Sequence, residues 1–371
     1  MASTAVPAQV QKAVDRIKAV LADGSFYEAQ QMFKSVYHRH RARKQMREAY
    51  LVLQEGAALQ MKNSQVTCGV ELGLLLIEAY TKDGVTVKEG GVLDGLLQLI
   101  ESFPRPPSGG GSSGAAHSMG GSSSSSGSRG GNDDKDCTQV EECSRLVLAA
   151  VKWANSNSQR GVSAACALHD AYAEYLWQAY GWKRFGHATQ HFVRGSNSAL
   201  FAEALTSCSA LAPAPEQDLF VTRAVLQVLA SAGRSSLKRH RRHARNVFDA
   251  HSKLRPTLDT PLLHFLDFLL QALERRSLPL VLLLKEKYAP VLDRDPTFGA
   301  LLYKIEQLHL DAHSSGGGLG GMLGGLFKNM AGGGGGAFDE IAEVEEGEGQ
   351  EEEEDVGLTL ETELSRNALI S

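Results

Sequence analysis

Apolar residues recur at helical spacing along most of the 371-residue chain. Near the N-terminus, Val10, Val14, Ile17 and Leu21 stand at i, i+4, i+7 and i+11, the spacing of one buried helical stripe. Similar stripes predict further helices over residues 70–80, 92–103, 143–153, 165–180, 186–193, 198–208, 218–230, 237–251, 261–273, 278–288 and 296–310. No segment has a convincing strand pattern, although residues 84–87 ("GVTV") are compatible with a short extended piece. The pattern predicts an all-α chain.

Short breaks between the predicted helices favour antiparallel neighbours. The break at Gly24 is followed by Ser25 and Glu28, which predict an N-cap with a capping box. Small residues such as Ala29 and Ala188 would allow two helix backbones to approach closely. The 34-residue period of tetratricopeptide repeats is not regularly met. We therefore predict a divergent α-solenoid, an architecture that mainly offers extended surfaces to other proteins.

Two stretches differ from the helical body in composition. Residues 104–136 are rich in Gly and Ser, and from residue 314 the chain is Gly-rich and then acidic, so both stretches are predicted to be disordered. The predicted division is 1–103 for the N-terminal half of the solenoid, 104–136 for the insert, 137–311 for the C-terminal half and 312–371 for the tail. Because the insert falls between helices, we expect it to leave the fold intact and to loosen contacts across the gap.

A Gly-Leu segment inside the tail keeps helical spacing despite its glycines. Its apolar residues are Leu319, Met322, Leu323, Leu326 and Phe327. The pattern is compatible with a segment that folds back on the array, engages a partner or stays loose.

Charge is unevenly distributed along the chain. The formal net charge is −5, but residues 338–371 hold 13 acidic residues and one basic residue, Arg366. The rest of the chain has 37 Lys+Arg against 30 Asp+Glu. A mildly basic body thus carries an acidic tail, a composition typical of solvated segments and sometimes of weak competitors for a basic face.

Two basic clusters stand out in this body. The first has six cations and no acid within 14 residues, namely Lys34, Arg39, Arg41, Arg43, Lys44 and Arg47, and the second is "KRHRRHAR" at 238–245. Such runs are compatible with nucleic-acid binding, a nuclear address or a docking face for an acidic protein. Aromatic residues do not alternate with the charges, and the clusters lie about 200 residues apart, which favours a protein partner over RNA. A helical-repeat protein associated with RNA or chromatin is the alternative hypothesis.

The two clusters are expected to be used differently. Residues 238–245 are interpreted as the solvated face of a helix that starts near Ser235 or Ser236. In the first cluster, helical spacing puts Lys34 and Arg41 on one face and Arg39 and Arg43 on another. Only one of these pairs is therefore expected to contact a partner.

Cysteine usage and the absence of catalytic motifs argue against a secreted protein or an enzyme. Five cysteines without repeated spacing do not predict a disulfide framework or a zinc site. The sequence has no secretory signal and no run of about 18 apolar residues, so we expect a cytosolic protein without direct membrane insertion. No phosphate loop, nucleophile elbow or zincin motif occurs, so no cofactor, metal or enzymatic activity is expected. A hydrolase using Cys166 or His169 is the alternative, although a hydrogen-bonded structural histidine is the simpler interpretation of His169.

Several stretches occur in an order that resembles one known family. They are "FYEAQQMFKSVYHRH", "LLLIEAYTK", "LWQAYGWKRFGHATQHFVRGSNS", "VTRAVLQVLA" and "YKIEQLHL", with the most specific stretch at "YAPVLDRDPTF". Over most of residues 9–311 they resemble the Golgi-to-ER traffic protein four family, cytosolic factors of the guided-entry pathway for tail-anchored membrane proteins. The resemblance implies a right-handed α-solenoid of tetratricopeptide-like helical hairpins without catalysis of its own.

The resemblance also implies a hetero-oligomeric adaptor. In the family, the N-terminal half docks on the ATPase that carries tail-anchored clients to the endoplasmic reticulum, and the C-terminal half holds a ubiquitin-like partner or a BAG-type scaffold. On this sequence the ATPase-docking face is expected to include Tyr27, Lys34, Arg39, Arg43, Lys44 and Arg47. No nucleic-acid partner is expected.

The C-terminal docking residues are expected on a helix that is apolar nearly all round. Residues 261–273 ("PLLHFLDFLLQAL") need cover on more than one side, and "VLLLKEKY" repeats the excess. Core packing accounts for most of these residues, and a bound partner would cover the remainder. The residues expected to contact that partner are Phe265, Phe268, Leu269 and Tyr288.

Overall fold

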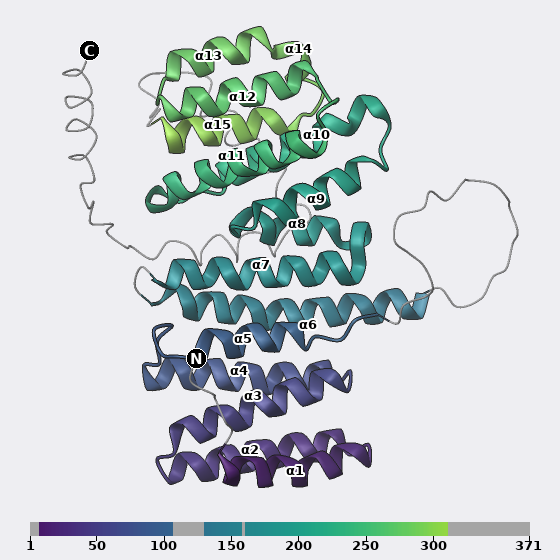
Figure 1. Cartoon of the computed structure of the whole chain (residues 1–371), viewed down its shortest axis with the longest axis vertical. Coiled ribbons are helices and arrows are strands. Elements are labelled where there is room, and N and C mark those ends of the chain that lie inside the picture. Colours follow the sequence, from purple (N-terminus) through teal and green to yellow (C-terminus); the bar gives the residue numbers. More distant parts are fainter. Residues whose placement is uncertain (1–6, 107–129, 158–159, 311–371) are drawn as a thin grey trace, which may run out of the picture.

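The computed structural model describes residues 7–106, 130–157 and 160–310, and these residues contain helices and turns without a strand. The α-helices are α1 (Ala8–Ala22), α2 (Phe26–Ala42), α3 (Met46–Lys62), α4 (Val66–Asp83), α5 (Val92–Glu101), α6 (Gly130–Asn155), α7 (Arg160–Tyr180), α8 (Phe185–Arg194), α9 (Ser198–Ser209), α10 (Gln217–Ala230), α11 (Leu237–Leu254), α12 (Pro261–Glu274), α13 (Leu278–Lys287), α14 (Ala289–Leu292) and α15 (Thr297–His309). Three 3-10 turns join them: η1 (Gly181–Arg184), η2 (Ala214–Glu216) and η3 (Arg234–Ser236). The helices stack along one long axis, with α1 and α2 at one end and α12 to α15 at the other (Figure 1). The prediction of an all-α solenoid is confirmed.

A recurring turn joins the first four helices. The residues in left-handed conformation are Gly24, Lys44 and Ser64, spaced by 20 residues, with φ of 80°, 58° and 60°. At each turn the N–H of that residue reaches back three residues and the next N–H reaches back five, which is a Schellman motif. Ser25 occupies the N-cap of α2 but its side chain makes no capping hydrogen bond, so the predicted capping box with Glu28 is wrong. The backbone turn itself reverses the chain.

Small residues let the first helices approach closely. Ala29 of α2 and Ala49 of α3 are fully buried, as is Ala188 of α8. Gly56 of α3 lies against Phe33 of α2, and a Cβ atom there would stand 2.7 Å from the ring. Ala29 and Ala188 thus lie in the packed interior, as their size suggests, and Gly56 leaves room for the Phe33 ring.

Helix α6 begins earlier than the sequence pattern predicts. Residues 130–136 are helical although their composition assigned them to the insert, while residues 107–129 lie outside the described residues. Residues 84–87, which were compatible with a short extended piece, form no strand: Gly84 has a φ of 68° and a turn begins at residue 87. The division into two halves stays a prediction, and the tail of residues 312–371 lies outside the described residues.

Contacts across the insert are tight. The carbonyl of Pro104 accepts hydrogen bonds from Gln139 Nε2 at 2.7 Å and from the Tyr175 hydroxyl at 2.8 Å. The Phe103 ring packs edge-on against Tyr175 with centroids 5.3 Å apart, and the Trp153 indole N–H donates to the Val85 carbonyl at 3.3 Å. The expectation of loosened contacts is wrong, because the residues on both sides of the insert share one hydrophobic core.

Candidate functional sites: a basic surface and an apolar face

Four cations gather where α2 turns into α3. Arg39, Arg43, Lys44 and Arg47 are all exposed, and we call them the α2–α3 basic surface. Lys44 takes the left-handed position of the turn, between Arg43 at the end of α2 and Arg47 near the start of α3. Tyr27 is 70% exposed but lies in the first turn of α2. At about 1.5 Å per residue it is roughly 18 Å from Arg39 along the helix, outside this surface.

The other two cations of the first cluster are engaged inside the fold. Lys34 Nζ lies 2.9 Å from Glu71 Oε2 of α4, and Gln30 Nε2 donates to the same oxygen at 2.8 Å. The hydrogen bond from Lys34 lowers the pKa of Glu71. Lys34 was expected to face a partner, but it is half-buried in this ion pair.

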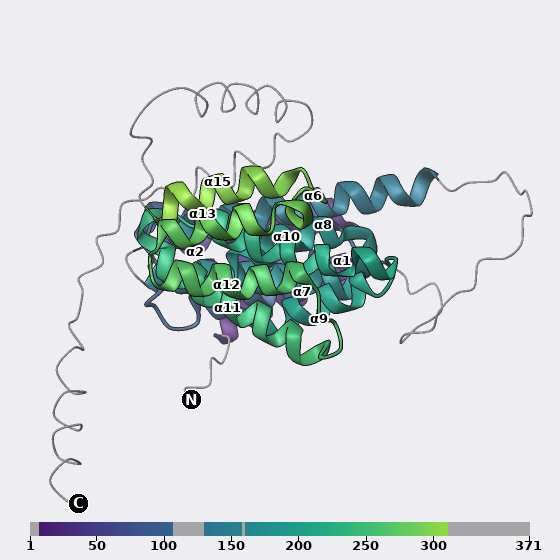
Figure 2. The same cartoon turned by 90° about the horizontal axis from the view of Figure 1, so that it is seen from above.

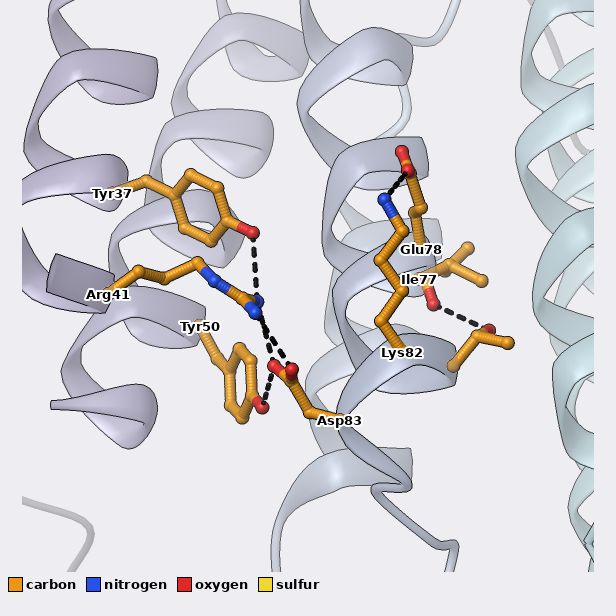
Figure 3. Close-up of polar contacts among 8 residues, drawn as sticks. Tyr37, Arg41, Tyr50, Ile77, Glu78, Lys82 and Asp83 are labelled. Carbon is orange, nitrogen blue, oxygen red and sulfur yellow. Dashed lines mark hydrogen bonds and ion pairs between the residues drawn. The ribbon is translucent and has the colours of Figure 1, made fainter. Parts of the chain in front are cut away.

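Arg41 makes the second internal contact, with Asp83 of α4. Its guanidinium donates to both carboxylate oxygens at 2.7 and 2.8 Å and to the Tyr37 hydroxyl at 3.2 Å. Tyr50 of α3 donates to Asp83 at 2.7 Å, so this carboxylate of α4 accepts hydrogen bonds from two other helices, α2 and α3 (Figure 3). The bonds from Arg41 lower the pKa of Asp83, and burial raises that of Tyr50. Of the two faces predicted for this cluster, the one with Lys34 and Arg41 packs on α4, and the one with Arg39 and Arg43 is exposed.

At the other end of the stack, two of the four expected docking residues belong to the core. Phe265 and Leu269 of α12 are fully buried, so the expectation that they face a partner is wrong. Tyr288 is half-buried, with its ring centroid 5.7 Å from that of Phe265. Phe268 alone of the four is exposed, at 45%.

Phe268 lines a cleft of about 690 Å³ between α11 and α12. Its other lining residues are Phe248, Asp249, Ser252, Lys253, Leu258, Asp259, Leu263, His264 and Asp267. The aromatic rings and leucines give the cleft apolar walls, and three aspartates stand around it. Its form suits an apolar side chain from a partner.

Helix α13 presents exposed leucines that were not among the expected docking residues. Of its ten residues, Val281 alone is buried, while Leu280, Leu282 and Leu283 are 38%, 49% and 48% exposed. We call these three leucines the α13 face. The excess of apolar residues in "VLLLKEKY" was the signal that pointed to it.

The second basic cluster faces mainly inward along α11. Arg239 donates to Cys166 Sγ and to the Arg194 carbonyl, both at 3.3 Å, and Arg245 donates to Asp267 at 2.6 Å. His240 and His243 of the same run are buried. The interpretation as a solvated helix face holds for Lys238 and Arg242, which are exposed, and is wrong for the rest. This arrangement leaves Lys238 and Arg242 as the exposed cations of the run.

The candidate catalytic residues are buried. His169 Nδ1 lies 2.9 Å from His191 Nδ1, and burial lowers the pKa of His169 and brings that of His191 to about 3. Cys166 is 6% exposed. In the described ranges no group of three or more His, Cys, Asp and Glu is placed to hold a metal. A search of the same residues found no helix that could cross a membrane.

Known proteins match the chain over most of its length. The family model for Golgi to ER traffic protein 4 (GET4) matches residues 43–327. The chain is similar to Protein GET4 of Arabidopsis thaliana, with 27% identity over 338 residues that cover 86% of this chain and 96% of that protein. It is 27% identical to the Golgi to ER traffic protein 4 homolog of Xenopus tropicalis over 347 residues, 91% of each. The crystal structure of C. therm. Get4 matches the fold with a TM-score of 0.62 at 19% identity, covering 89% of this chain and 98% of that one.

Proposed function

The chain belongs to the Golgi to ER traffic protein 4 family, and on that basis we propose that it is a non-catalytic adaptor in the delivery of tail-anchored membrane proteins to the endoplasmic reticulum. In this proposal it acts in the cytosol and bridges the targeting ATPase of the pathway to a ubiquitin-like or BAG-type co-chaperone. The observation that carries the proposal is the separation of two exposed surfaces of different chemistry. The α2–α3 basic surface lies near one end of the stack and the α13 face near the other (Figure 1).

The α2–α3 basic surface is assigned to the ATPase. Four exposed cations around one turn attract an acidic surface over about a Debye length, roughly 8–10 Å at physiological salt. Complementary charge raises the association rate and fixes orientation more than it adds affinity. Lys34 and Arg41 are not used, because their charges are satisfied by Glu71 and Asp83. Tyr27 would make a separate apolar contact at the other end of α2.

The α13 face is assigned to the co-chaperone. Exposed leucines on one helix are typical of a groove or face that takes an amphipathic helix of a partner. Phe268 and the cleft between α11 and α12 offer a second apolar site at the same end of the stack. An apolar contact of this kind suits a partner that stays bound, whereas the charged contact suits one that exchanges.

Charge reversal tests the assignment of the basic surface. The variant Arg43→Glu with Lys44→Glu should weaken binding of the ATPase by at least tenfold, and raising the salt concentration should weaken wild-type binding in the same direction. The matched control reverses two exposed cations elsewhere, Lys62 at the far end of α3 and Lys304 of α15. Both variants change the net charge equally. Isothermal titration at several salt concentrations measures the difference, and equal loss in both variants would reduce the effect to net charge alone.

A further inference from the structure

A group of exposed cations lies where α11 begins and α12 ends. Arg241 of α11 is half-buried, and its Nη1 donates to the carbonyl of Leu273, near the end of α12, at 3.2 Å. This hydrogen bond brings the start of α11 beside the turn between α12 and α13. Four exposed cations flank it, two on α11 and two in the turn, namely Lys238, Arg242, Arg275 and Arg276. We call these four residues the α11–α12 basic surface.

Helix stability does not account for this surface. The dipole of α12 favours cations near its end, but Lys238 lies in the first turn of α11, where the dipole disfavours a cation and no acid stands. Arg276 has a φ of 49°, a left-handed conformation for which glycine is preferred. Burial and the charge of Arg276 lower the pKa of Arg241, so like charges stand close together here. Costs of this kind, in backbone conformation and in repulsion, collect at binding sites.

The α11–α12 basic surface adjoins the α13 face. Helix α12 lies between α11 and α13 at this end of the stack (Figure 2). Arg276 stands four residues before Leu280, which lies in the first turn of α13. Glu274, the last residue of α12, has its Oε1 3.7 Å from Nε of Arg245. Within the described residues neither Arg275 nor Arg276 forms an ion pair, so both guanidinium groups are available to a partner that covers the leucines.

We propose that the α11–α12 basic surface binds acidic side chains at one end of the helix that the co-chaperone lays on the α13 face. This inference rests on the proposed function, in which the α13 face holds the co-chaperone. The partner helix would place its apolar stripe on Leu280, Leu282 and Leu283 and its carboxylates on Arg275 and Arg276. Guanidinium groups bind carboxylates through two parallel hydrogen bonds, a geometry that fixes position as well as adding energy.

The charges give the docking helix a direction. Exposed leucines alone would let an amphipathic helix slide along α13 or bind in reverse. Cations at one end of the leucines select one direction and register, because a reversed helix would hold its carboxylates away from the arginines. A nucleic acid would offer phosphates to the cations but no apolar face to the leucines. An acidic, amphipathic protein helix therefore fits both surfaces together.

Two synthetic peptides test the charge contact without any protein of the pathway. Both are amphipathic helices with one leucine stripe; one carries glutamates in its first two turns, and its twin carries glutamines there. By fluorescence anisotropy, the full-length chain should bind the glutamate peptide about tenfold more tightly than the glutamine peptide at low salt. The variant Arg275→Gln with Arg276→Gly should bind both equally. Because glycine suits the left-handed turn, this variant keeps the fold. The matched control, Lys12→Gln with Lys62→Gln, removes two exposed cations of α1 and α3 and should keep the preference.

Several outcomes would overturn the inference. They are equal binding of the two peptides to the wild type, no binding of either, and a preference that survives in Arg275→Gln with Arg276→Gly. Binding of the wild type to vesicles of equimolar phosphatidylserine and phosphatidylcholine, lost in that variant, would also overturn it, because the surface would then serve a membrane. If the co-chaperone itself binds wild type and variant equally, this inference fails and the proposed function stands. Failure of the co-chaperone to bind at all would contradict the proposed function, whatever the peptides show.

Discussion

Arg41 of α2 and Asp83 of α4 are joined by two parallel hydrogen bonds, from Nη1 to Oδ2 at 2.7 Å and from Nη2 to Oδ1 at 2.8 Å. Tyr50 of α3 donates to the same carboxylate, so the pair ties three successive helices together (Figure 3). Planar, two-pronged contacts of this kind are the strong form of an arginine–carboxylate pair. A cation that looks like part of a binding surface in the sequence is thus a structural residue.

Replacing Arg41 by Met keeps the aliphatic stem and removes both hydrogen bonds. Because the pair is partly exposed, we expect a loss of about 1–2 kcal/mol in the free energy of unfolding near pH 7. Urea unfolding measures this loss. The matched control is Arg43→Met, which lies two residues further at the helix end and is exposed. It should change the free energy by no more than about 0.5 kcal/mol.

The variant Arg41→Met should also lose part of the pH dependence of the free energy of unfolding. The pKa of Asp83 in the folded state lies below its unfolded value of about 3.9 because Arg41 hydrogen-bonds the carboxylate. The stabilisation is therefore present above the unfolded pKa and is lost as the pH falls through the folded pKa. The difference between wild type and Arg41→Met should shrink below about pH 4, and a constant difference down to about pH 3 would contradict the account.

Ser64→Gly should stabilise the protein. Ser64 takes a φ of 60° in the Schellman turn between α3 and α4, where a side chain costs about 1 kcal/mol and glycine does not. We expect a gain of roughly 0.5–1 kcal/mol, visible in thermal unfolding. Ser64→Ala keeps the Cβ atom and should give no such gain. Similar gains from both substitutions would show that the backbone conformation is not the cause.

Gly56→Ala should destabilise the protein although alanine favours helices. A Cβ at this position would stand 2.7 Å from the fully buried Phe33 ring, so the ring or the helix must move. Overpacking of this kind costs about 1–3 kcal/mol. Gly299→Ala in α15 is the control, because nothing lies within 4 Å of its added Cβ. It should be neutral or stabilising in chemical denaturation, and a neutral Gly56→Ala would mean that Phe33 repacks freely.

The buried histidines should make the fold sensitive to mild acid. Burial lowers the pKa of His191 to about 3, below the unfolded value of about 6.5, so the unfolded state binds more protons between these values. Stability therefore falls as the pH falls from about 6.5, at up to about 1.4 kcal/mol per pH unit for one such group. His191→Phe should reduce this slope between about pH 6 and pH 4.5, measured by urea unfolding. An unchanged slope in His191→Phe would contradict the assignment.

The helices were predictable from the sequence because the spacing of apolar residues that produces them is local. The stripe of Val10, Val14, Ile17 and Leu21 is buried as its spacing predicts. The start of α6 was missed because residues 130–136 are mostly Gly and charged residues, a composition without a hydrophobic stripe. The partners of the first basic cluster were also missed. Glu71 and Asp83 follow Lys34 and Arg41 by 37 and 42 residues, and only the stacking of α2 on α4 brings them together.

Helices α12 and α13 show a second limit of sequence reasoning. An all-round apolar helix such as α12 or α13 indicates that neighbours are needed, but not how many the fold supplies. Helix α12 has neighbours that bury Phe265 and Leu269, whereas α13 lies at the end of the stack and leaves Leu282 and Leu283 exposed. The distinction follows from position in the array, which the periodicity does not contain.

The most direct test of the adaptor proposal is sedimentation velocity of the full-length chain with the ATPase and the co-chaperone together. The account predicts one complex that contains all three. Arg43→Glu with Lys44→Glu should release only the ATPase, and Leu283→Asp should release only the co-chaperone, because the two surfaces lie at different ends of the stack. Two mutually exclusive binary complexes, or loss of both partners from either variant, would contradict it.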